Sequence, residues 1–107
     1  MTEVTLLQEA KDRIHSMLSL LFDWVPVGNQ TYPSNRSLNG FVFRRYAYDD
    51  LLVFNESSEL MVHAISRRRW DDELVFLIEH TSDNWPCLLR LAFELETLFV
   101  LDRLAEI

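Results

Sequence analysis

The sequence predicts an α+β fold in two layers: an N-terminal helix, an antiparallel meander of three or four strands, and a C-terminal helix. Three observations predict it. Apolar residues recur at helical spacing near the N-terminus, aromatic and β-branched residues dominate residues 41–80, and a polar cap followed by proline precedes the last apolar segment. Because 107 residues is a common length for one domain, we expect a single domain over residues 1–107.

The first helix is predicted over residues 5–25. Its apolar residues recur at alternating steps of three and four, which places them on one helical face: Leu7, Ala10, Ile14, Met17, Leu21 and Trp24. Thr5 followed by Gln8 predicts a capping box, and Pro26 ends the pattern.

Residues 26–40 are predicted to form a long loop, because they contain both glycines and two of the three prolines. Loops of this length inside a small domain are often functional or mobile. The loop is therefore a candidate binding segment, and a connector without function is the alternative.

Four strands are expected, over residues 41–48, 51–55, 60–66 and 74–80. The turns between them contain no Asn-Gly or Asp-Gly pair, so the sequence does not fix their register. The stretch from 60 to 69 is also compatible with a helix.

A meander with these turns has two apolar faces. One face would pack against the helices and carry Val42, Tyr46, Tyr48, Leu51, Val53, Leu60, Val62, Ala64, Phe76 and Ile78. The other face would carry Phe41, Phe43, Arg45, Leu52, Phe54, Met61, His63, Ile65, Val75, Leu77 and Glu79. Helices on both faces would cover both sets, whereas helices on one face alone would leave the second set for a partner.

The C-terminal helix is expected from residue 85 to near the end of the chain, after a polar cap at Asn84 and with Pro86 in its first turn. One apolar stripe contains Leu88, Leu91, Ala92, Leu95, Leu98 and Phe99. A second stripe, of Leu89, Phe93, Val100 and Leu104, needs another helix or a second subunit to pack against.

These surplus apolar surfaces predict a homodimer that also binds another protein, since exposed apolar patches usually mark interaction sites. The candidate contact residues are Phe43, Arg45, Phe54, Met61 and His63 in the sheet and Leu89, Phe93, Val100 and Leu104 in the helix. Aromatic residues at predicted strand ends could instead line a pocket for a small molecule: Tyr46, Tyr48 and Trp70.

The composition excludes some partners. The formal net charge of −7 disfavours free nucleic acid and anionic lipid. No apolar run reaches the roughly 18 residues of a membrane span, and the first residues do not resemble a signal peptide. A single cysteine, Cys87, fits a reducing compartment, so we expect a cytoplasmic protein.

No motif predicts catalysis, a cofactor or a metal. Cys87 at a helix start has no base assigned to it, and the three histidines lack metal-site spacing. The Arg67–Trp70 cluster is followed at once by three acids, which predicts a solvated hairpin with internal ion pairs. Asp49-Asp50 and Asp71-Asp72 are typical of turns.

The preferred hypothesis is therefore a small acidic, non-enzymatic interaction module, a homodimer that binds another protein through an exposed sheet face or the 26–40 loop. A small-molecule binding protein or minor enzyme, with a pocket between sheet and helices, is the alternative. An acidic inhibitor that imitates nucleic acid is a weaker one.

Overall fold

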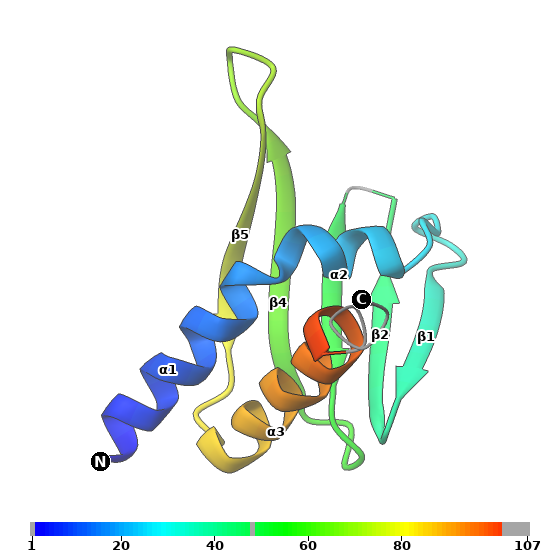
Figure 1. Cartoon of the computed structure of the whole chain (residues 1–107). Coiled ribbons are helices and arrows are strands. Elements are labelled where there is room, and N and C mark those ends of the chain that lie inside the picture. Colours follow the sequence, from blue (N-terminus) through cyan, green and yellow to red (C-terminus); the bar gives the residue numbers. More distant parts are fainter. Residues whose placement is uncertain (1, 48, 102–107) are drawn as a thin grey trace.

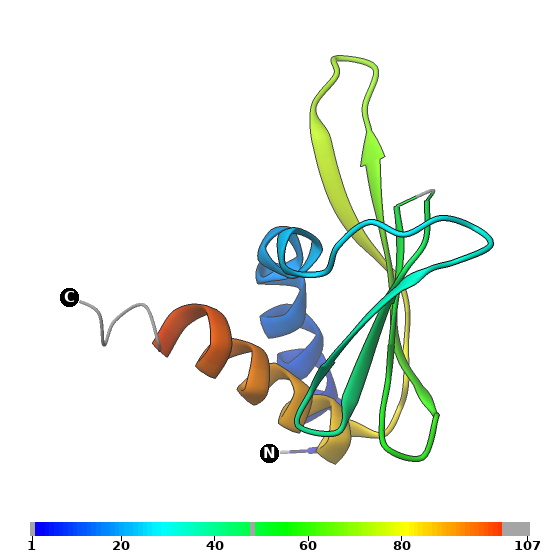
Figure 2. The ribbon, with the colours of Figure 1, turned by 90° about the vertical axis from the view of Figure 1, so that its right-hand side faces the viewer.

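The computed structural model describes residues 2–47 and 49–101. A five-stranded antiparallel sheet in the order β1-β2-β3-β4-β5 is covered on one face by the helices (Figures 1 and 2). The elements are α1 (Glu3–Ser16), α2 (Leu18–Trp24), β1 (Ser34–Leu38), β2 (Phe41–Arg45), β3 (Asp50–Phe54), β4 (Leu60–Arg68), β5 (Leu74–Thr81), α3 (Trp85–Glu96) and the π-helical turn η1 (Thr97–Leu101). The α+β class is confirmed, and the sheet has five strands rather than three or four.

The N-terminal helix is broken in two and begins earlier than expected. Thr2 caps it by accepting a hydrogen bond from Thr5 N–H at 3.2 Å, so the predicted capping box of Thr5 and Gln8 is wrong. The break lies at Met17 (φ −107°, ψ 6°), directly after Ser16, whose hydroxyl donates to the carbonyl of Arg13 at 2.7 Å. A serine hydroxyl that donates to a carbonyl of the preceding turn competes with the backbone hydrogen bonds and bends the helix.

The additional strand, β1, lies inside the range predicted to be a loop. Asn39 (φ 45°) and Gly40 (φ 91°) form the tight turn that joins β1 to β2. Positive φ at both central residues is the conformation that an Asn-Gly pair favours in a hairpin. The connection between α2 and the sheet is thereby shortened to residues 26–33.

Strand β4 settles the ambiguity over residues 60–69, because Leu60–Arg68 is a strand paired on both sides.

The start of the last helix is as predicted. Asn84 accepts a hydrogen bond from Cys87 N–H at 3.3 Å, and proline follows in the first turn.

The predicted phase of β2, that is, which alternate residues point toward the helices, is wrong by one residue. Phe43 pairs with Val53, which places the odd-numbered residues of β2 on the helix side and turns Val42 to the opposite face. The turn after β2 is closed by a hydrogen bond from Tyr46 N–H to the carbonyl of Asp50 at 3.0 Å, and its length decides this phase. Tyr48, also assigned to the helix side, lies outside the described residues.

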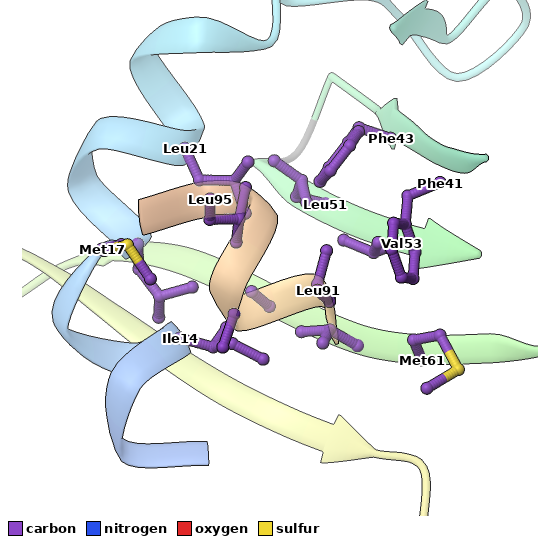
Figure 3. Packing of buried hydrophobic residues seen from close by; sticks show 14 of the residues in the cluster. Ile14, Met17, Leu21, Phe41, Phe43, Leu51, Val53, Met61, Leu91 and Leu95 are labelled. Atoms are coloured by element: carbon purple, nitrogen blue, oxygen red, sulfur yellow. The ribbon is translucent and has the colours of Figure 1, made fainter. Parts of the chain in front are cut away.

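The core is a continuous apolar layer between the sheet and the helices. Figure 3 shows side chains from α1, α2, β2, β3, β4 and α3 pointing into it: Ile14, Met17, Leu21, Phe41, Phe43, Leu51, Val53, Met61, Leu91 and Leu95. A register shift between β3 and β4 lets both Met61 and Val62 be fully buried. The core uses the helices on one face only, so the other face of the sheet contributes little to it.

Candidate protein interface

The face of the sheet that points away from the helices is the candidate site, and we call it the open face. Cross-strand pairing assigns residues to it, because residues paired across an antiparallel ladder share one face. It carries an apolar set with polar neighbours: Val42, Arg44, Asp50, Leu52, Phe54, Leu60, His63, Ile65, Arg67, Val75 and Leu77. Figure 2 shows the sheet from the side, with the helices on one side of it only.

The residues of the open face form rows across the strands. Arg44 pairs with Leu52, and Leu52 pairs in turn with His63. In the next row Asp50 pairs with Ile65, and Ile65 pairs with Leu77. A third row, Val42 with Phe54 and Phe54 with Leu60, is apolar throughout, so apolar side chains lie on all four strands from β2 to β5, with Arg44 and His63 among them. Most of them are half-buried by one another, and Leu77 on the edge strand is 37% exposed.

Two contacts fix the side chain of Arg44 on this face. Its Nε donates to Asn35 Oδ1 on β1 at 3.0 Å, and its guanidinium lies 5.4 Å from the centre of the Phe54 ring. Cation–π contacts of this kind fix a cationic side chain over an aromatic one. The open face thus has an ordered cation beside its largest apolar side chain.

His63 and Asp50 form the most specific polar contact on the open face, with Nε2 2.9 Å from Oδ1. Beside them is a hollow of ≈ 300 Å³ lined by Gln30, Tyr46, Asp50, Leu52 and His63. Gln30 comes from the 26–33 loop, so the loop and the open face meet here.

A histidine held by a carboxylate is one part of a nucleophilic site, but such a site also needs a nucleophile within reach of the imidazole. The hollow offers the Tyr46 hydroxyl and, among its lining residues, no serine or cysteine. Cys87 lies at the start of α3, half-buried, with Sγ 3.7 Å from Asn55 Nδ2. The described residues contain no group of three or more His, Cys, Asp or Glu able to hold a metal.

The sequence-predicted contact residues of the sheet divide into two groups. Phe54 and His63 lie on the open face, whereas Phe43 and Met61 are fully buried in the core. The predicted face was wrong for both: the strand pairing of β2 turns Phe43 to the helix side, and the register shift beside Met61 turns that residue there as well.

Arg45, also predicted as a contact residue, lies on the helix side for the same reason as Phe43, since both are odd-numbered residues of β2. Its guanidinium lies on the helix side, where Nη1 donates to the carbonyl of Phe22 and to that of Val25 at 2.9 Å. These are carbonyls at the C-terminal end of α2, which lack partners within the helix. Arg45 therefore caps α2 and secures it to the sheet.

The second apolar stripe of the last helix is on the other side of the molecule from the open face. Phe93 is 59% exposed and Val100 is 42% exposed, while Leu89 is half-buried against the core. Leu104 lies outside the described residues. As contact residues, Phe93, Val100 and Leu89 remain a prediction.

Trp70 stands at the tip of the β4–β5 hairpin, 93% exposed, and is not among the residues that line the hollow beside His63. Tyr46, another predicted pocket residue, lines the hollow beside His63, and Tyr48 lies outside the described residues. The hairpin carries the expected internal ion pairs, such as Arg69 Nη1 to Glu73 Oε2 at 3.4 Å.

The centre of the space between sheet and helices is filled by the apolar core, and a hollow of ≈ 460 Å³ lies at its margin, between α1 and β5. Sequence reasoning missed Gln30 and Asp50 as site residues. Gln30 reaches the hollow from a loop, and no local pattern predicts that. Asp50 follows a turn residue with positive φ, Asp49, and resembles part of the same turn in the sequence.

No helix in the described residues is both long and apolar enough to cross a membrane. Comparison of the chain with protein-family models, with curated proteins and with solved structures finds no match.

Proposed function

We propose that this chain is a non-enzymatic interaction module, a homodimer that binds another protein through the open face of its sheet. The 26–33 loop borders that face and forms part of the contact.

One observation carries this proposal: all of the described helices cover the same face of the sheet. The opposite face has apolar residues on four strands, including Val42, Phe54, Ile65 and Leu77. Monomeric proteins seldom leave such an area in water, and an apolar centre with polar groups around it is the usual composition of a protein interface.

The charges on the open face favour a partner of defined chemistry. Arg44 and Arg67 lie on it, and the carboxylate of Asp50 is hydrogen-bonded to His63. Two arginines and one carboxylate leave a net positive charge on these residues, whereas the whole chain has a net charge of −7. A protein surface with apolar side chains bordered by carboxylates complements it.

The proposal can be tested with a photo-crosslinking amino acid placed at Leu52, in the centre of the open face, in cells that naturally make the chain. The matched control has the same amino acid at Ser19, which is exposed on α2 on the helix side. We expect a discrete product with a second protein from the Leu52 position and none from Ser19. Products from both positions, from neither, or only between two copies of the chain would contradict binding of a partner at this face.

The hollow beside His63 supports a second candidate function, the binding of a small polar molecule. Its ≈ 300 Å³ is at the lower end of ligand sites, and Gln30, Tyr46 and Asp50 offer hydrogen-bonding groups. Ligand-observed NMR with a set of small polar compounds would test it, with the His63→Ala variant as the control. Binding that the variant loses would favour this candidate over a purely protein partner.

A further inference from the structure

We propose that the edge of β5 is the dimer contact: β5 of one chain pairs antiparallel with β5 of a second copy, and the two sheets become one continuous sheet. This inference rests on the homodimer part of the proposed function and identifies the surface that forms it.

The first step is that β5 has backbone groups directed outward. In the described part of the chain β5 is the last strand of the sheet and pairs on one side only, with β4. The Ser66 N–H donates to the carbonyl of Asp49 on the β3 side at 3.0 Å, so Ser66 and its partner Phe76 are a non-hydrogen-bonded pair on the β5 side. The N–H and C=O of Phe76 therefore point away from the sheet.

The same alternation extends along the strand. Arg69 N–H donates to the carbonyl of Glu73 at 2.8 Å at the hairpin end, which makes Arg67 with Val75 and Ile65 with Leu77 the hydrogen-bonded pairs. Leu74, Phe76 and Ile78 then all present donors and acceptors to the outside. Water can satisfy these groups one by one, whereas another extended segment pairs with the whole row at once.

The second step is the sequence of this edge. Leu74 to Ile78 is uncharged and contains no proline, and Leu74 and Leu77 are 44% and 37% exposed. Long apolar edge strands without charges or proline readily pair with other strands. Antiparallel pairing of this segment with its own copy sets apolar side chains against apolar side chains on both faces of the joined sheet.

The third step is the shape of the chain around β5. The β4–β5 hairpin projects beyond the helices in both views (Figures 1 and 2). At the other end of β5 a hollow of ≈ 460 Å³ separates the strand from α1, with Gln8, Lys11 and His15 on one side and Glu79 and His80 on the other. In an antiparallel pair the projecting end of each β5 runs beside this hollow of the other chain.

The fourth step fixes the number of copies. The opposite edge of the sheet, β1, has only five residues, mostly polar, and is preceded by Pro33. Loop residue Gly28 lies so close to β1 that an added Cβ would collide with the backbone nitrogen of Ser34. Because β1 is a poor template, pairing of β5 with β1 and growth of a filament are disfavoured, and pairing of β5 with β5 closes at two chains.

The test is the solution mass of the whole chain by light scattering across a concentration series. We expect the mass of two chains, falling toward one on dilution. The Leu77→Lys variant, which introduces a charge on the edge strand, should weaken the dimer at least tenfold. Leu52→Lys introduces the same charge on the same face two strands away and should leave the dimer intact.

A wild-type chain that stays monomeric would refute both the dimer and this contact. A dimer that survives Leu77→Lys, or one that Leu52→Lys disrupts equally, would refute the β5 contact alone. Hydrogen exchange provides a check that needs no variant: the amides of Leu74, Phe76 and Ile78 should be protected at high concentration and exchange faster on dilution. Concentration-independent exchange at these amides in a dimeric sample would also overturn the inference.

Discussion

The two faces of the sheet have similar side chains and different surroundings. On the helix side Phe41, Phe43 and Val53 are fully buried against the helices. On the open face Phe54, Leu52 and Ile65 lie among other sheet residues, and no helix of the described residues covers them (Figure 2). Hydrophobicity alone therefore does not distinguish the face that forms the core from the face that we assign to a partner. The two faces are distinguished by the helices, which pack on one of them only.

The largest effect that this comparison predicts is on the helix side. Phe43→Ala should lower the free energy of unfolding by about 3–5 kcal/mol, because it removes a fully buried ring that lies edge-on to Trp24 at 5.2 Å. Denaturant titration measures this loss. A loss below about 1 kcal/mol would mean that this face is not the core.

The turn that creates β1 should have the next largest effect. Gly40→Ala places a side chain at φ +91°, where the new Cβ would also meet the Glu56 carboxylate, and should cost about 1–2 kcal/mol. Ser37→Ala, an exposed change on the same strand, is the control and should be nearly neutral in denaturant titration. Equal stability of the two variants would contradict the assigned turn.

The open face should be less sensitive in stability than the helix side. Phe54→Ala is matched to Phe43→Ala, since the two rings are on neighbouring strands and opposite faces. We expect a loss of about 1 kcal/mol or less, from the contact with Arg44 and the neighbouring side chains. A loss equal to that of Phe43→Ala, measured in the same titration, would place Phe54 in a core.

The smallest effect concerns the helix layer itself. Arg13 on α1 donates to both carboxylate oxygens of Glu96 on α3, at 2.5 and 2.9 Å. These hydrogen bonds lower the pKa of the Glu96 carboxyl below its ordinary 4.5, against the opposing effect of desolvation. A lowered pKa in the folded state stabilises the fold above the unfolded-state pKa, and this contribution is lost as the pH falls through the folded-state pKa.

Glu96→Gln should therefore cost about 0.5–1 kcal/mol at pH 7. The difference in the free energy of unfolding between Glu96→Gln and wild type should shrink as the pH falls below the ordinary glutamate pKa of 4.5. The measurement is denaturant titration at several pH values. A difference that stays constant from pH 7 to the lowest pH at which the wild type is folded would show that the carboxylate charge contributes nothing to the contact between α1 and α3.

The fold class, the start of α3 and four of the strands could be predicted, because local patterns carry them. The Asn84 cap and the proline that follows are sufficient to begin a helix, and the apolar stripe of residues 5–25 is continuous through the break at Met17. Strand β1 was missed because its own residues are polar and do not alternate, although Asn39-Gly40 directly before Phe41 is a strong hairpin signal.

The open face could be predicted as a type of surface but not residue by residue. The phase of β2 depends on a turn after Arg45, and the burial of both Met61 and Val62 depends on a register shift between strands. Neither feature has a local signature in the sequence, and a one-residue error exchanges the two faces. Phe54 and His63 were predicted for the open face, and Phe43 was predicted there because of this error.

Hydroxyl-radical footprinting tests most directly whether the open face is a contact surface. The chain would be labelled once alone and once in its native assembly, isolated under mild conditions, and the modification of each side chain compared. We expect strong protection of Leu52, Phe54 and His63 in the assembly, with unchanged labelling of Val4, which is 77% exposed on α1. Unchanged labelling of Leu52, Phe54 and His63 would contradict the account.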